Sequence, residues 1–181
     1  MSLIQSNAQG FGARLVAGST SIFLHNRGLG FSLEAGHPAE YGPMRRPPHT
    51  LSPAMVTNPD GSLRAVLGTM GGDAQPQVVL QLLARLLHSA QDARTCVEAP
   101  RWRLAAPAGD DGFDTWSASG MVRVVLEPGA PESWSSGLTT RGHEVVEASG
   151  SSHGHAHMIE VTEAGELRGA ADPRAAGSAV V

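Results

Sequence analysis

Cysteine, positive charge and long apolar runs are all scarce in this chain of 181 residues. Its single cysteine, Cys96, excludes an internal disulfide framework, and the apolar helical stretch around it favours a buried structural thiol over a nucleophile. Lys and Arg number 13 against 17 Asp and Glu, so the net charge of -4 offers no basic surface for nucleic acid or acidic membrane. No apolar run approaches the roughly 18 residues of a membrane span. We therefore expect neither nucleic acid nor a membrane as a partner.

Glycine and proline, in contrast, are plentiful. The chain has 22 Gly and 12 Pro, and 41% of its residues are hydrophobic, which is typical of a turn-rich globular protein. A chain of this length can bury a sizeable core, and we expect a single domain over residues 1–181. Its first quarter is predicted to contain a strand at 2–7, a glycine turn at 10–12, a hairpin within 13–24 and a long irregular loop over 26–48.

Strand and helix patterns in the rest of the chain predict an α+β fold. Two apolar strands, 54–57 and 62–69, are joined by Asn58-Pro59-Asp60-Gly61, whose residues favour a tight turn. A helix follows, where Asp73 can cap the first turn and Pro76 suits it. Because hairpins dominate and no βαβ alternation suggests a wholly parallel sheet, we expect a sandwich built on antiparallel sheets. The remaining predicted elements are helices over 90–98 and within 129–142, and strands over 121–128, 143–148, 155–161 and 167–172.

Two segments could bind an anionic group. Gly71 and Gly72 lie between a strand and a helix, where glycine lets backbone N–H groups approach a ligand and the helix N-terminus adds positive potential. An ordinary strand-to-helix turn explains the same pair, since the patterns of phosphate loops are missing. The segment RRPPHTLSP, residues 45–53, could present Thr50 and Ser52 to a carboxylate, or could be a rigid loop with surface arginines. The residues alone leave both alternatives open.

Three histidines, His153, His155 and His157, alternate with small residues. On a strand this spacing places all three side chains on one face, which could hold zinc. No cysteine cluster or carboxylate-rich neighbour accompanies them. We therefore expect no metal site, and nothing in the sequence calls for a cofactor.

Six motifs occur in order along nearly the whole chain: SNAQGFG, FLHNRGLGFSL, RRPPHTLSP, GTMGGDAQPQ, EAPRW and GAADPR. In order and spacing they resemble the small, C-terminal subunit of the γ-glutamyltransferases (γ-glutamyltranspeptidases). The resemblance implies an N-terminal nucleophile hydrolase with the four-layer αββα fold, made as a precursor that cleaves itself into a large and a small subunit. It also implies that the small subunit's new N-terminal threonine is the nucleophile and that its own amine is the base. A hydroxyl needs such an adjacent base to attack an amide.

The resemblance assigns roles around that nucleophile. It makes the backbone of Gly71 and Gly72 the oxyanion hole. Asn7 matches an asparagine that helps to bind the γ-glutamyl amino group, and Gln5 matches a threonine that contacts the nucleophile. The substitution at Gln5 is a departure from the family pattern.

Substrate recognition departs further from that of strict glutathione-cleaving enzymes. The hydroxyl pair that binds the substrate α-carboxylate falls on His49 and Thr50, so one hydroxyl is kept. Family members that recognise the γ-glutamyl group carry a glutamine and an aspartate where this chain has Arg27 and Gly30. Without the aspartate, the α-ammonium group of the substrate loses its carboxylate partner. The chain therefore resembles the γ-glutamyltransferase-like branch that includes glutaryl and cephalosporin acylases. The implied substrate is a small-molecule amide of a γ-glutamyl or related dicarboxylic acyl group.

The first residues resemble the second strand of such a subunit, so we expect the first strand and the threonine to be absent from this chain. Ser2 lies too deep in that strand to replace the nucleophile. We expect the chain alone to be inactive and to need the large subunit of the same precursor. Two alternatives are a non-catalytic domain that keeps a carboxylate site and a metal-binding module on the histidine strand. A targeting signal would lie upstream, which leaves the compartment open between cytoplasm and periplasm or secretion.

Overall fold

The computed structural model divides the chain into two compact units, one formed by Met1–Ile4 with the residues from Ser52 onward and the other by Gln5–Leu51. No helix in the described part of the chain is long and apolar enough to cross a membrane. Position 121, the first residue of one predicted strand, lies outside the described residues. The described residues are 1–105, 122–148 and 153–176.

The opening residues do not form the predicted strand, which is wrong for Ser2 to Asn7. The first of them contact the sheet through side chains instead of a backbone ladder. The Ser2 hydroxyl donates to the Leu67 carbonyl at 2.9 Å, and a Cβ on Gly68 would meet the Ile4 side chain at 3.3 Å. Without paired N–H and C=O groups, an extended stretch is not part of a sheet.

The unit Gln5–Leu51 is made of turns, as the glycine-rich and proline-rich sequence predicts. The predicted turn at Gly10–Gly12 is closed by a hydrogen bond from the Gly12 amide to the Gln9 carbonyl at 2.9 Å. The predicted hairpin has one antiparallel bridge, Val16 with Phe23, around the short 3-10 helix η1 (Gly18–Thr20). A second 3-10 turn, η2 (Arg27–Gly30), lies in the irregular loop.

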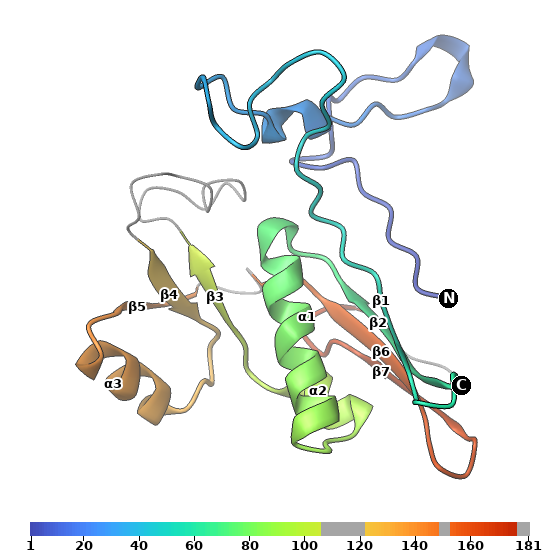
Figure 1. Ribbon diagram of the computed structural model, residues 1–181, viewed down its shortest axis with the longest axis vertical. Helices are drawn as coiled ribbons and strands as arrows, with labels where there is room; N and C mark the ends of the chain where they lie inside the picture. The colour runs from blue at the N-terminus through green and yellow to red at the C-terminus, as the bar shows by residue number, and fades with distance from the viewer. Residues whose placement is uncertain (106–121, 149–152, 177–181) are drawn as a thin grey trace. The chain divides into compact units, whose positions relative to one another are not determined.

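The larger unit contains an antiparallel sheet in the order β1-β2-β6-β7 (Figure 1). The strands β1 (Ala54–Thr57) and β2 (Leu63–Thr69) form the predicted hairpin, and β6 (Ala156–Val161) joins β2 to β7 (Leu167–Ala171). Alternate side chains of β2 and β6 are buried, which is the pattern of strands with one covered face. The predicted strands therefore lie side by side although nearly 100 residues separate some of them.

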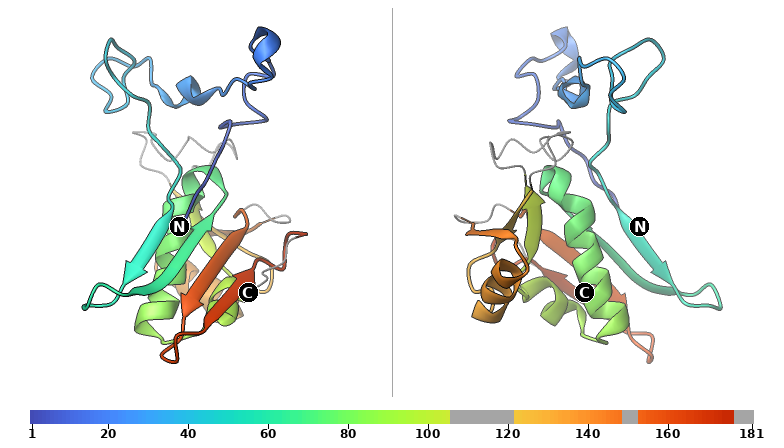
Figure 2. Two further views of the ribbon diagram at one scale, coloured as in Figure 1. Left: turned by 90° about the vertical axis from the view of Figure 1, so that its right-hand side faces the viewer. Right: turned by 60° about the vertical axis from the view of Figure 1, so that its left-hand side comes forward.

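Two helices cover that face of the sheet (Figures 1 and 2). The 3-10 turn η3 (Gly72–Ala74) leads into α1 (Gln75–Leu83), which continues as a π-helical turn, η4 (Ala84–His88). Asp73 does not cap α1 as predicted, because Ala74 occupies the cap position, while α2 (Ala93–Glu98) is capped by Asp92. The core consists of buried side chains from the sheet and both helices, among them Leu67, Val78, Leu82, Cys96, Val97 and Met158.

A second, three-stranded sheet follows the order β3-β4-β5. It contains β3 (Trp102–Ala105), β4 (Arg123–Leu126) and β5 (Glu144–Glu147), and α3 (Glu132–Thr140) connects the last two in parallel. Two α1 glutamines one turn apart cover the edge of β3. Gln81 exchanges hydrogen bonds of 2.8 and 3.0 Å with the Trp102 backbone, and Gln77 accepts one from Leu104 at 2.7 Å. These bonds tie the second sheet to the helical layer.

Candidate functional site

The Gly71–Gly72 junction connects the end of β2 to the start of α1. Gly71 has a φ of 125° and Gly72 a φ of 55°, a region of backbone space that favours glycine. None of the backbone hydrogen bonds recorded for the described residues is donated by the amide of either glycine. A Cβ on Gly72 would have no heavy atom within 4 Å, so this residue borders open space. The junction therefore offers two adjacent N–H groups where the helix potential is positive.

The opposite side of the junction is packed tightly against the segment 153–155. The Met70 amide donates to the His155 carbonyl at 3.1 Å, and a Cβ on Gly71 would lie 2.9 Å from the His153 carbonyl oxygen. A Cβ on Gly154, whose φ is 74°, would collide with the Met70 carbonyl. Only glycines at both positions allow the two backbones to approach this closely.

Arg27 and Thr50 come together in the unit Gln5–Leu51. The Arg27 guanidinium donates to the Thr50 hydroxyl at 2.7 Å, and the two residues are 7% and 8% exposed. No carboxylate in the described part of the chain pairs with Arg27. A buried guanidinium that lacks a counter-ion favours a bound anion.

The other predicted site residues of this unit lie nearer its surface. Asn7 is half-buried, and its carbonyl accepts a hydrogen bond from the Asn26 amide at 3.1 Å. Gln5 and His49 are exposed, and Gly30 is the half-buried last residue of η2. Of these residues, the structure brings Thr50 into contact with Arg27, while His49 lies at the surface.

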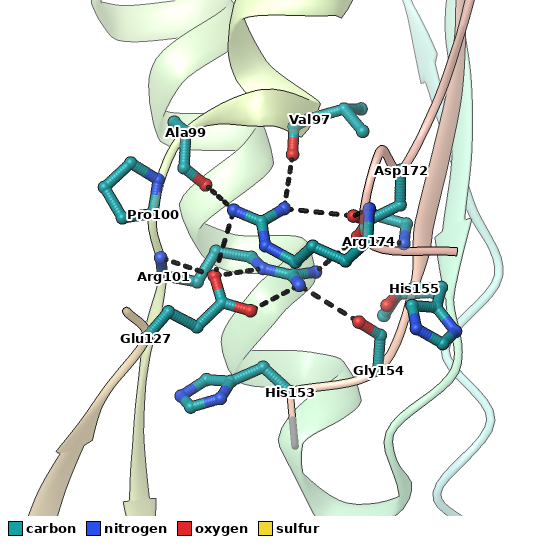
Figure 3. A network of polar contacts seen from close by, with 12 residues as sticks. Val97, Ala99, Pro100, Arg101, Glu127, His153, Gly154, His155, Asp172 and Arg174 are labelled. Carbon is teal, nitrogen blue, oxygen red and sulfur yellow. Dashed lines mark hydrogen bonds and ion pairs between the residues drawn. The ribbon is translucent and has the colours of Figure 1, made fainter. Parts of the chain in front are cut away.

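The three histidines do not share a face, because β6 begins only at Ala156. His153 is fully buried with its Nε2 at 3.1 Å from the Val125 carbonyl, whereas His157 is exposed. His153 and His155 point away from each other (Figure 3), and the described residues contain no group of three or more His, Cys, Asp or Glu suited to a metal. Burial lowers the pKa of His153 below its ordinary value.

A network of four charged side chains, three of them buried, lies behind the segment 153–155 (Figure 3). Arg101 binds Glu127 with both ends of its guanidinium, Nε to Oε2 at 3.0 Å and Nη2 to Oε1 at 2.6 Å. Its Nη1 lies 3.2 Å from Asp172, and Arg174 contacts Asp172 at 3.0 Å and Glu127 at 3.2 Å. Arg101, Glu127 and Asp172 are each at most 1% exposed. Two positive and two negative charges therefore neutralise one another, and Arg174, with 22% of its side chain exposed, is the member of the network that reaches the surface.

Hydrogen bonds hold Asp172 in its charged form. Burial alone would raise its pKa, but the amides of Ala156 and Arg174 donate to its carboxylate and the Arg101 charge lies beside it. Together these interactions keep the pKa of Asp172 below its ordinary value. No sequence pattern indicated this network, although the motifs EAPRW and GAADPR contain three of its members.

All 181 residues of the chain, 1–181, match the family described as gamma-glutamyltranspeptidase. The chain belongs to the γ-glutamyltranspeptidase family. It is 35% identical over 182 residues to a glutathione hydrolase-like proenzyme, YwrD, of Bacillus subtilis strain 168, and covers 33% of that protein with 99% of its own length. It is also 35% identical over 181 residues to an oxamate amidohydrolase proenzyme of Klebsiella pneumoniae, with 99% and 32% covered. This γ-glutamyltranspeptidase family chain thus spans about a third of the length of both relatives.

Solved structures confirm the predicted fold of this γ-glutamyltranspeptidase family member. The chain superposes on γ-glutamyltranspeptidase of Pseudomonas nitroreducens with a TM-score of 0.80 and 22% identity, covering 100% of this chain and 92% of that one. On cephalosporin acylase of Bacillus halodurans the TM-score is 0.79 with 30% identity, covering 94% of this chain and 30% of the acylase. The chain therefore has the N-terminal nucleophile hydrolase fold of these enzymes in the part that corresponds to a small subunit.

Proposed function

We propose that this chain supplies the oxyanion hole and part of the acyl-donor pocket of an enzyme that hydrolyses or transfers an acyl group from an amide. The acyl group is γ-glutamyl or a related dicarboxylic acyl group, and the reaction passes through an acyl-enzyme. The observation that carries the proposal is the Gly71–Gly72 junction in a chain of this family: among the described residues neither amide donates a backbone hydrogen bond, and Gly72 borders open space.

The chemistry follows from what those amides can stabilise. A hydroxyl nucleophile, which family resemblance assigns to an N-terminal threonine, adds to the amide carbonyl while its proton passes to the adjacent amine. The carbonyl oxygen becomes negative, and the amides of Gly71 and Gly72 donate to it, each contributing about 3 to 4 kcal/mol in such sites. The C–N bond then breaks, the leaving amine takes the proton, and water or an acceptor amine removes the acyl group in the second half-reaction.

Arg27 favours a donor that carries a negative group. Its buried guanidinium has Thr50 as its side-chain partner and no carboxylate partner among the described residues. An arginine recognises a carboxylate with parallel charge-assisted hydrogen bonds but repels an ammonium. With Gly30 in place of an acidic residue, the pocket suits a dicarboxylic or oxamate-like donor better than one recognised through its ammonium.

A large subunit from the same precursor is the proposed partner. Both relatives reported above are named proenzymes, and this chain covers about a third of each. The donor of one relative, oxamate, belongs on the list of candidate substrates for this chain's enzyme.

The proposal is tested with the complete protein that contains this chain, supplied with γ-glutamyl and glutaryl anilides and with oxamate. We expect turnover of at least one donor, with glutaryl or oxamate preferred over γ-glutamyl. Gly71→Ala should lower kcat by about 10²- to 10³-fold, since it displaces a donor to the oxyanion. The absence of turnover for every donor would sink the proposal.

Arg27→Met tests the donor preference separately. Loss of the guanidinium should raise KM for the glutaryl donor about tenfold or more, which is the size of one lost charge-assisted hydrogen bond. KM for a neutral acyl anilide should stay within about twofold in the same variant. Equal changes in KM for both donors would show that Arg27 does not bind the negative group of the donor.

The buried Arg27–Thr50 pair also fits a second candidate, a non-catalytic domain that binds small carboxylates. Calorimetric titration with glutarate and glutamate separates the two. Binding without turnover of any donor supports the binding domain, and turnover excludes it.

A further inference from the structure

Arg101 contacts more than its buried counter-ions. Its Nη2 donates to the Gly154 carbonyl at 3.0 Å in addition to Glu127, so one side chain connects the charged network to the backbone of 153–155 (Figure 3). Its own amide donates to Glu127 as well, at 2.9 Å. Because the side chain of Arg101 is only 1% exposed and both ends of its guanidinium make hydrogen bonds or ion pairs, Arg101 has little freedom to move.

The segment that Arg101 holds is the wall behind the oxyanion glycines. Met70 donates to the His155 carbonyl, and Gly71 packs on the His153 carbonyl with no room for a Cβ. The His153 ring attaches the same segment to β4 through the Val125 carbonyl. A displacement of the segment 153–155 therefore changes the support on which the Gly71 backbone rests.

We infer that Arg101 is a positioning residue for the Gly71–Gly72 oxyanion site, acting through the Gly154 carbonyl. The inference rests on the proposed function and adds a role for the buried charges, which otherwise serve stability alone. Donors in an oxyanion hole must stand at hydrogen-bond distance from the position that the oxygen takes in the transition state. Displacement of a group by about 1 Å, even from outside the reacting centre, can lower a rate by about 10²-fold.

Arg101→Lys tests the inference in the complete enzyme. Lysine keeps a positive charge near Glu127, but a single ammonium cannot reproduce the planar fork that reaches Glu127 and Gly154 together. We expect kcat to fall at least about tenfold while KM stays within about twofold, because substrate binding does not require the oxyanion. Arg85→Lys is the matched control. Arg85 lies 3.5 Å from the Pro100 carbonyl, next to Arg101, and makes no recorded contact with 153–155.

Gly154→Ala tests the same link between the segment 153–155 and the Gly71–Gly72 junction, and it leaves every charged side chain in place. The added Cβ collides with the Met70 carbonyl and should displace the glycine junction, so kcat should fall as in Arg101→Lys. Gly129→Ala is its control, since Gly129 has a comparable φ of 83° but no heavy atom within 4 Å of an added Cβ. This control variant should keep the kcat of the unmodified enzyme.

The amide resonances of Gly71 and Gly72, in protein labelled with ¹⁵N-glycine, give a readout that needs no activity. They should shift in Arg101→Lys and Gly154→Ala and stay in place in both controls. If the enzyme turns over no amide, the proposed function fails while these shifts still decide the inference. Unchanged resonances and kcat in folded Arg101→Lys would overturn it. It would also be overturned if neither test variant folds while both controls do, because Arg101 would then be a folding determinant only.

Discussion

Replacing Glu127 by glutamine removes one charge from the buried network without changing the shape of the side chain. The four side chains, Arg101, Arg174, Glu127 and Asp172, balance two positive against two negative charges, and the substitution leaves one positive charge uncompensated. Glu127 accepts three hydrogen bonds from Arg101, at 2.6, 2.9 and 3.0 Å, and lies 3.2 Å from Arg174. Breaking a fully buried ion pair such as Arg101–Glu127 costs about 3 to 5 kcal/mol, because the Arg101 guanidinium, which is 1% exposed, has no water to solvate it.

The assay is thermal unfolding of the complete protein, followed by calorimetry. For a domain of this size each kcal/mol corresponds to about 2 to 4 °C, so Glu127→Gln should lower Tm by about 10 °C. Glu98→Gln is the control, since its ion pair with Arg94 is on the surface, with side chains 46% and 80% exposed, and should matter little. A decrease of less than about 2 °C in Glu127→Gln would show that the partly exposed Arg174 or water compensates for the lost charge.

Three further predictions concern acid stability, thiol reactivity and the edge of β3. The pKa of the Asp172 carboxyl is lowered from 3.8, so its contribution to stability is complete above about pH 4 and is lost as the pH falls through the lower pKa of the folded state. In Asp172→Asn, Tm should therefore fall less steeply as the solution is acidified. An unchanged dependence of Tm on acid pH would contradict this prediction. Burial raises the pKa of Cys96 to about 11, so Ellman's reagent should label this thiol only after denaturation, and rapid labelling of the native protein would show that it is accessible. Gln81→Leu leaves the Trp102 N–H and C=O without their glutamine partner, which costs about 1 to 3 kcal/mol. Tm should therefore fall by about 5 °C. An unchanged Tm would show that water replaces the glutamine.

The elements that the sequence predicts correctly are those set by local rules. The β1–β2 hairpin follows from its turn residues, and α1 follows from apolar spacing and Pro76. The strand β3 (Trp102–Ala105) was not predicted, because its four residues pair with β4 and contact α1 across distant parts of the sequence. The strand predicted at the start of the chain failed for a related reason, since no partner strand pairs with it among the described residues.

In the candidate site too, residues that are consecutive in the sequence can be predicted, whereas contacts between distant residues cannot. The glycine pair is visible in the sequence because strand, glycines and helix are consecutive. The contact of Arg27 with Thr50 joins residues 23 positions apart, and no periodicity indicates it. The charged network is less visible still, because Glu127 lies 26 residues from Arg101 and outside the six motifs, and only the folded chain brings the two together.

The proposed function depends on the amides of Gly71 and Gly72 acting as an oxyanion hole. A crystal structure of the complete enzyme with a boronic acid analogue of its acyl donor tests this directly, since the boron forms a tetrahedral adduct with a hydroxyl nucleophile. We predict one boronate oxygen at about 2.7 to 3.1 Å from both amide nitrogens. An adduct whose oxygens all lie beyond hydrogen-bond distance of both glycine amides would show that the junction does not stabilise the oxyanion.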